Sequence, residues 1–282
     1  MGGSGPFARP HGRIPLTLPV LRRAAALSLL PVSLAVGCSY PVEGRFMGRE
    51  LGETGPPART ILILYNHGFS PAAAGRYRPW APPIIREAQL RNPDVVVFAQ
   101  VRNASHMTPL DHASFAEAAV EEFRRRGVPP ANIILAGQSC GAWGSLVAAA
   151  FTYPDIGGVL AIAPTCHGRL PHYTAVRDRR AQQIAQIAER ARFPGRILLY
   201  EGDLSYTLEE WDQFERVSGA LAPDLRIQRI RRKRVLEVCG ARCQRDSHPA
   251  VLGPGFAPAF YAADLQPLIE QVRAGIRARE GQ

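Results

Sequence analysis

The segment from Asn132 to Ser145 restricts the possible folds of this chain more than any other. An apolar run, Ile133 to Ala136, leads into Gly-Gln-Ser-Cys-Gly at positions 137–141, and small, helix-compatible residues follow up to Phe151. The predicted order is therefore a buried strand, a sharp turn with Ser139 at its apex, and a helix. The glycines two positions before and two after the serine allow a strained backbone, because a Cβ at either place would crowd the neighbouring strand or helix.

The pattern Gly-x-Ser-x-Gly resembles the nucleophile elbow of the α/β-hydrolase fold, and this resemblance makes Ser139 the candidate nucleophile. The same five residues are also compatible with a plain glycine-rich turn between a strand and its crossover helix. Two other glycine motifs do not fit. The segment lacks the Gly-Lys-Ser/Thr ending of a phosphate loop, and its glycines have the wrong spacing for a dinucleotide-binding fingerprint.

Length and composition are those of one soluble α/β domain that carries a leader. The chain has 282 residues, of which 46% are hydrophobic and 21% charged, so neither a disordered chain nor a multi-span membrane protein is indicated. Four of the ten net positive charges are arginines that precede Cys38. The other basic residues are spread out, apart from the run at 231–234, and accompany no nucleic-acid motif. No nucleic-acid partner is therefore expected.

Residues 1–38 are predicted to be an export signal. An uncharged, largely apolar run from Ala24 to Val36 follows Arg22-Arg23; it is too short to span a bilayer but suits the core of a signal peptide. The ending Ala-Val-Gly-Cys resembles the lipobox of bacterial lipoproteins, in which the cysteine, here Cys38, is lipidated. An ordinary cleaved signal and an uncleaved anchor are the alternatives. All three place the body of the chain outside the cytoplasm, in the periplasm or cell envelope, with membrane contact through the anchor only.

Residues 39–59, rich in Gly, Pro and charge, are expected to form a tether or a loop leading into a domain at 60–282. Strands and helices alternate from there. The expected strands are 61–65, 95–101, 133–136, 158–163, 196–200 and 225–230, and the expected helices are 79–91, 111–126, 142–151, 173–192, 208–221 and 256–278. This alternation requires crossover connections, which predicts an α/β fold with a mainly parallel sheet of about six strands and helices on both faces.

The α/β-hydrolase resemblance also implies positions for the remaining site residues. A His-Gly pair after an early strand introduces the oxyanion loop in these proteins, and here Asn66-His67-Gly68-Phe69 follows the strand at 61–65. The backbone N–H groups of Phe69 and Cys140 are then the implied oxyanion donors. The side chain of His67 is expected only to brace the loop.

The chain order in this fold is nucleophile, acid, histidine. Asp203 is the predicted acid, because Glu201-Gly-Asp203 follows a strand at the carboxyl edge of the sheet, where ligands bind in open α/β folds. Glu201 is the second candidate and Asp212 the third. His248 is the predicted general base, on the loop between the last strand and the last helix. Simple turn chemistry at Gly-Asp and a surface histidine without a partner remain the alternatives.

Cysteine usage fits export. With Cys38 lipidated, four cysteines remain: Cys239 and Cys243 can close a small loop before His248, and Cys140 and Cys166 follow neighbouring strands. Sequence alone leaves their connectivity open. Four histidines share no metal-ligand spacing with cysteines or acids, so no metal or other cofactor is predicted; these are His106, His112, His167 and His172.

Together these features predict a serine hydrolase that cleaves a carboxylic ester or related acyl bond in a small-molecule or lipid-like substrate. The resemblance to α/β-hydrolases covers roughly residues 60–278. Within that superfamily the layout of the chain is similar to the dienelactone-hydrolase-like and small-esterase branches. Dienelactone hydrolases, however, use a cysteine nucleophile where this chain has Ser139. Only the stretch 166–192 is able to form a cap, so a minimal cap is expected. The alternatives are a non-catalytic envelope lipoprotein that binds an acyl or glycan ligand, and an amide-cleaving peptidase on the same fold. The oligomeric state is left open.

Overall fold

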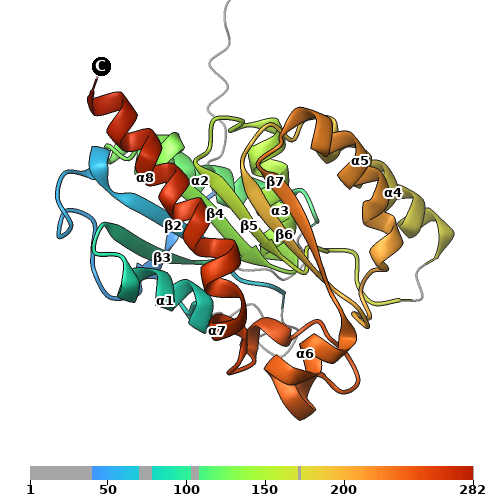
Figure 1. The fold of residues 1–282 in the computed structure, drawn as a ribbon. Helices are drawn as coiled ribbons and strands as arrows, with labels where there is room; N and C mark the ends of the chain where they lie inside the picture. The colour runs from blue at the N-terminus through green and yellow to red at the C-terminus, as the bar shows by residue number, and fades with distance from the viewer. Residues whose placement is uncertain (1–39, 70–77, 103–107, 171–172, 282) are drawn as a thin grey trace, which may run out of the picture. The chain divides into compact units, whose positions relative to one another are not determined.

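The computed structural model describes residues 40–69, 78–102, 108–170 and 173–281. Its centre is a seven-stranded sheet with the strand order β1-β3-β2-β4-β5-β6-β7 (Figure 1). Strands β2 to β7 are parallel, and β1 pairs antiparallel with β3 at one edge. The predicted signal peptide, with Cys38, lies outside the described residues, as do His106 and His172.

The strands are β1 (Glu43–Phe46), β2 (Ile61–Asn66), β3 (Val95–Val101), β4 (Ile133–Gln138), β5 (Gly158–Ile162), β6 (Gly195–Tyr200) and β7 (Leu225–Ile230). The helices are α1 (Pro83–Arg91), α2 (Asp111–Arg125), α3 (Cys140–Phe151), α4 (Thr174–Ala188), α5 (Asp212–Leu221), α6 (Arg232–Cys239), α7 (Phe256–Phe260) and α8 (Gln266–Glu280). The predicted fold class is confirmed, with one strand more than expected.

The extra strand, β1, lies in the segment for which a tether or loop was expected. Its residues pair with β3, from Glu43 opposite Val101 to Phe46 opposite Phe98. Three of its four residues are exposed, and only Phe46 packs inward, edge-on against Phe98 and Phe123. An exposed edge strand of four residues has no apolar run, so the hydrophobic pattern could not predict it.

The closing helix is interrupted where the sequence predicted one continuous element. Helix α7 is followed by a π-helical turn, Tyr261–Leu265, and only then by α8. Pro267 lies in the first turn of α8, where its missing N–H is tolerated. The expected helix at 208–221 is likewise divided, into a 3₁₀ turn at Leu208–Trp211 and α5.

The core fills both faces of the sheet. Strands β2, β4 and β5 are buried along almost their whole length, as their continuous apolar runs predict for a parallel sheet covered on both sides. Figure 1 shows α8 crossing one face with α1 and α7 beside it, and α2 and α3 behind the sheet. In the strand order, β4 is the middle strand of the sheet. Its carboxyl end therefore lies at the centre of the edge that is formed by the carboxyl ends of the parallel strands.

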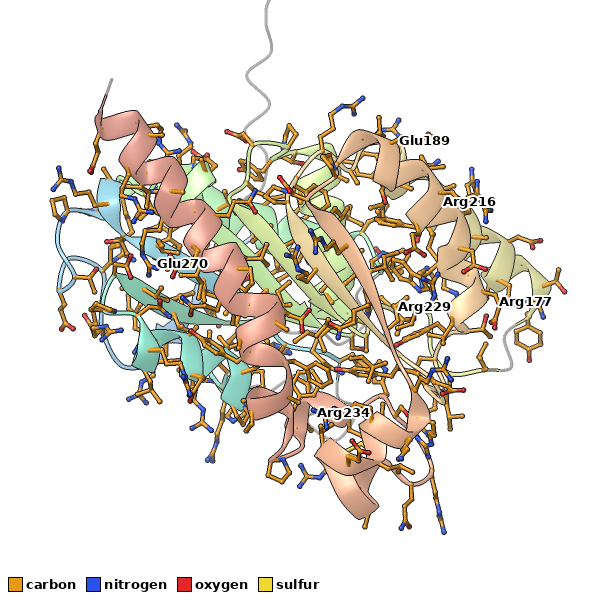
Figure 2. All side chains as sticks on the ribbon, viewed as in Figure 1. Arg177, Glu189, Arg216, Arg229, Arg234 and Glu270 are labelled. Carbon is orange, nitrogen blue, oxygen red and sulfur yellow. A yellow bond between two sulfur atoms is a disulfide. The ribbon has the colours of Figure 1, made fainter. Side chains whose placement is uncertain are left out.

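Charged side chains lie mainly on the outer helices and edge strands (Figure 2). Arg229 on β7, for example, forms ion pairs with Asp212 and Glu215 of α5. Asp212, the third candidate acid, is thus engaged on the surface. Within the described ranges, the structure contains no helix that is both long and apolar enough to cross a membrane.

Asp264 is an acid in the π-helical turn that is only 4% exposed. Burial raises its pKa to about 6, an effect that the charge of Arg196 on β6 partly opposes. In the unfolded chain the carboxyl ionises near its ordinary value of 3.8. The contribution of Asp264 to stability is therefore fully present below that value and is lost as the pH rises through about 6.

We expect Asp264→Asn to increase the free energy of unfolding relative to wild type at pH 8, by roughly 1–3 kcal/mol, and to have little effect at pH 4. The reason is that the amide removes the cost of a buried carboxylate, which exists only at the higher pH. Urea denaturation at both pH values measures the difference. An equal change at pH 4 and pH 8 would show that ionisation of Asp264 is not involved.

Candidate active site

Ser139 occupies the turn between β4 and α3 with a strained backbone. Its φ and ψ angles are 56° and −125°, and φ lies in the region that non-glycine residues seldom adopt, at a cost of about 1–3 kcal/mol. Hydrogen bonds hold this conformation. The Ser139 N–H donates to the Ile162 carbonyl at 3.0 Å, and the Ser139 carbonyl accepts from the Trp143 N–H at 2.9 Å. The turn is thereby fixed to both β5 and α3.

The two glycines that flank Ser139 make close contacts that a side chain would prevent. A Cβ on Gly137 would lie 2.5 Å from the backbone nitrogen of Ala142 in α3. A Cβ on Gly141 would lie 2.0 Å from the carbonyl oxygen of Asn66, at the end of β2. The prediction that a side chain at these positions would crowd the neighbouring helix and strand is confirmed.

The structure brings together the three side chains that sequence selected as nucleophile, acid and base. The distance from His248 Nε2 to Ser139 Oγ is 2.8 Å, and that from His248 Nδ1 to Asp203 Oδ2 is 2.7 Å. The Asp203 side chain is fully buried, and that of His248 is 19% exposed. The second oxygen of Asp203 accepts the N–H of Ser205 at 2.8 Å. The carboxylate is therefore held on one side by backbone and on the other by the imidazole.

The competing acid, Glu201, is directed elsewhere. Its carboxylate accepts the backbone N–H of Arg232, the first residue of α6, at 2.7 Å. Glu201 thus satisfies a helix N-terminus, while Asp203 contacts His248. The structure thus assigns different contacts to two carboxylates that lie only two residues apart in sequence. The sequence alone left open which of them contacts His248.

The residues that carry the two implied oxyanion donors line the same pocket as Ser139. Cys140 is the first residue of α3, so its N–H has no acceptor within the helix and lies at the positive end of the helix dipole. Phe69 follows Gly68, where an added Cβ would be 3.0 Å from Ser139 Cβ. Both residues line a pocket of about 400 Å³ together with Ser139 and His248. The remaining lining residues are Thr165, Cys166, His167, Gly168, Arg169 and Ser205.

The four cysteines in the described residues form two disulfides. Cys140 is bonded to Cys166, and Cys239 is bonded to Cys243. The first disulfide ties the start of α3 to the segment after β5 and forms part of the pocket wall. His112 lies within 4.8 Å of both of its sulfur atoms, but sulfurs joined in a disulfide offer no thiolate to a metal ion.

Two histidines under the site are neutral because they are buried near a cation. Burial lowers the pKa of His67 and of His112 to about 3, and the charge of Arg102 acts in the same direction. The Arg102 guanidinium donates to the carbonyl of His67 and, at 2.9 Å, to His112 Nδ1. His67 Nδ1 is 2.7 Å from the carbonyl oxygen of Gly68, to which neutral imidazole donates. This contact matches the expectation that the side chain of His67 braces the loop.

The residues that join the acid loop to the base loop were not predicted from the sequence. The Ser247 N–H donates to the Gly202 carbonyl at 3.0 Å, and its hydroxyl donates to the Glu201 carbonyl at 2.6 Å. Arg232 donates to the Ser247 hydroxyl and to the Gln244 carbonyl. Arg232 belongs to the basic run at 231–234, for which the sequence analysis predicted no role in the site. The position of Ser247 directly before His248 was the only available signal.

Comparison with known proteins gives no sequence-level relative. No family model matches the chain, and no curated protein matches it. Solved structures do match. The monoacylglycerol lipase of Paleococcus ferrophilus superposes with a TM-score of 0.54 at 13% identity, over 82% of this chain and 100% of that chain. Est1E from Butyrivibrio proteoclasticus with bound ferulic acid gives a TM-score of 0.48 at 14% identity, over 86% of this chain and 96% of that chain.

An esterase of Pyrococcus furiosus gives a TM-score of 0.47 at 16% identity, over 70% of this chain and 80% of that chain. Together with the strand order, the likeness to the lipase shows that this chain has the α/β-hydrolase fold. At these identities the likeness extends to the fold alone.

We expect Gly141→Ala to lower the free energy of unfolding by more than about 2 kcal/mol, because the new methyl group would overlap the carbonyl of Asn66. Gly219→Ala is the matched control. Gly219 lies in α5 with no atom within 4 Å of an added Cβ, and the change should be neutral or stabilising by up to about 1 kcal/mol. Thermal and urea denaturation compare the two variants. Equal stability would contradict the close contact at the turn.

Proposed function

We propose that this protein is a serine hydrolase that cleaves a carboxylic ester or a related acyl bond. The observation that supports this most is the unbroken hydrogen-bonded chain from Asp203 through His248 to Ser139, with distances of 2.7 and 2.8 Å. The hydroxyl at its end lies on a strained turn and borders a pocket. This combination has the geometry of a nucleophile, its general base and the group that orients the base.

In the proposed mechanism, Ser139 Oγ attacks the carbonyl carbon of the substrate while its proton passes to His248 Nε2. Asp203 accepts the Nδ1–H of His248, which selects the tautomer with a free Nε2 and stabilises the imidazolium that forms. The tetrahedral intermediate expels the alcohol, which takes the proton back from His248. Water then attacks the acyl-serine by the same route and releases the acid.

The negative charge on the tetrahedral intermediate requires fixed donors. We assign this role to the backbone N–H groups of Cys140 and Phe69, and each such donor is typically worth about 3–4 kcal/mol in the transition state. The Cys140–Cys166 disulfide holds the first donor in place from the pocket side. No cofactor enters this mechanism.

The pocket suggests an apolar acyl group as the substrate part next to Ser139. Its wall includes the Cys140–Cys166 disulfide, Gly168 and Phe69, a residue that is 48% exposed. A volume of about 400 Å³ suits a small or medium-sized group. The proposed substrate is therefore a small-molecule or lipid-like ester.

We expect Ser139→Ala to abolish labelling by a fluorophosphonate probe and to reduce hydrolysis of 4-nitrophenyl esters by at least about 1,000-fold. The reason is that both reactions need the activated hydroxyl. Gel-based labelling and a panel of esters of increasing acyl length provide the measurements. Ser114→Ala, on α2 and outside the pocket, is the control and should keep both activities.

Undiminished labelling of the alanine variant would refute the assignment of Ser139. A folded wild-type protein without labelling or hydrolysis would favour the non-catalytic alternative, a lipoprotein that binds an acyl or glycan ligand. Cleavage of matched amides but not of esters would favour the peptidase alternative.

The proposal includes an exported protein that is lipid-anchored at Cys38. The leader at 1–38 carries the lipobox-like ending, and the two disulfides of the domain are typical of an oxidising compartment. A single acyl chain gives only marginal membrane binding, so stable anchoring takes more than one chain.

We expect Cys38→Ser to abolish incorporation of a clickable fatty acid in a bacterial host with a lipoprotein-processing pathway, and to move the protein from the membrane fraction to the soluble fraction. The serine removes the thiol to which the lipid is attached. Gel fluorescence after fractionation measures both effects. Equal fatty-acid incorporation in the variant and the wild type would contradict lipidation at Cys38.

A further inference from the structure

Asp246 lies between the acid loop and the base loop, two residues before His248. Its side chain is largely buried, at 11% exposure. One carboxylate oxygen, Oδ1, accepts two backbone N–H groups, that of His248 at 3.0 Å and that of Leu204 at 3.2 Å. The other oxygen, Oδ2, accepts from Arg169 at 2.9 Å. A buried carboxylate with three donors is strongly held in one position.

The two hydrogen bonds that Oδ1 accepts come from the backbone next to the proposed acid and from the backbone of the proposed base. Leu204 directly follows Asp203, and the other N–H belongs to His248 itself. The two loops follow different strands, with Asp203 after β6 and His248 beyond β7 and α6. One oxygen atom therefore sets the distance between the backbones that carry the proposed acid and the proposed base.

Other contacts hold the loops together without reaching these two backbone groups. Ser247 bonds to the carbonyls of Glu201 and Gly202, and Arg232 bonds to Ser247. These contacts involve neither the N–H of Leu204 nor the side chain of Asp246. Asp246 is thus separable from the general attachment of the loops.

We propose that Asp246 is a positioning residue for the reaction proposed above, and this inference rests on that function. By accepting the N–H groups of Leu204 and His248 with one oxygen, it keeps the His248 ring in line between Asp203 and Ser139. Arg169, whose side chain is 71% exposed at the pocket wall, compensates the charge of Asp246. The role depends on the position of the acceptor oxygen and not on the charge of the carboxylate.

Asp246→Asn and Asp246→Glu separate position from charge. Asparagine keeps an acceptor oxygen in place and removes the charge, so kcat for a short 4-nitrophenyl ester should stay within about threefold of wild type. Glutamate keeps the charge but moves the acceptor by one methylene, so kcat should fall by about 10- to 100-fold with KM little changed. The kcat of Asp246→Ala should fall at least as far as that of Asp246→Glu. Melting curves establish that each variant is folded. If the alanine variant does not fold, the comparison of Asp246→Asn with Asp246→Glu still tests the inference.

Asp212→Ala is the matched control, since it removes another arginine-paired aspartate, on α5 and away from the pocket, and should leave kcat unchanged. The inference is overturned if the glutamate or alanine variant is folded and has wild-type kcat, or if the asparagine variant loses as much activity as the glutamate variant. Failure of the proposed function would look different, because Ser139→Ala would then be as active as wild type.

Discussion

The arrangement of the candidate site depends on one strained residue, Ser139, at the carboxyl end of the middle strand β4. Ser139 keeps a positive φ because the turn around it is fixed on three sides: by the hydrogen bond to β5, by the first turn of α3, and by the close approach of Gly141 to the end of β2. The surrounding packing overcomes a cost of about 1–3 kcal/mol. In return, the hydroxyl stands clear of the strand and beside the N-terminus of a helix, where a negative charge is favoured.

The order of the strands brings the partners of Ser139 to the same place. Strand β4 lies in the middle of the sheet, and β6 and β7 lie on one side of it, so the loops after these strands open onto the same edge. His248 contacts Ser139, and Asp203 contacts His248, although His248 is 109 residues from Ser139 in sequence. Two sets of hydrogen bonds hold the loops in a fixed geometry: the Ser247 N–H donates to the Gly202 carbonyl, and the Asp246 carboxylate accepts the N–H groups of Leu204 and His248.

Much of this could be predicted from the sequence, and the reasons are physical. Strands buried on both faces need continuous apolar runs, so β2 and β3 were located almost to the residue. The edge strand β1 buries little more than Phe46 and gave no such run. Asp203 and His248 were predicted from the chain order and from their places after strands, whereas the choice against Glu201 required its bond to the N-terminus of α6. The contact of Asp246 with the N–H of Leu204 could not be predicted, because the two residues are 42 positions apart in sequence.

The central claim is that Ser139 is a nucleophile activated by His248, with the oxyanion bound by backbone N–H groups. A crystal structure of the protein after reaction with an organophosphorus fluoride tests it most directly. The account predicts phosphorus bonded to Ser139 Oγ, with a phosphoryl oxygen about 3 Å from the backbone nitrogens of Cys140 and Phe69. An unmodified Ser139 in the treated protein, or an adduct whose oxygen points away from both nitrogens, would contradict it.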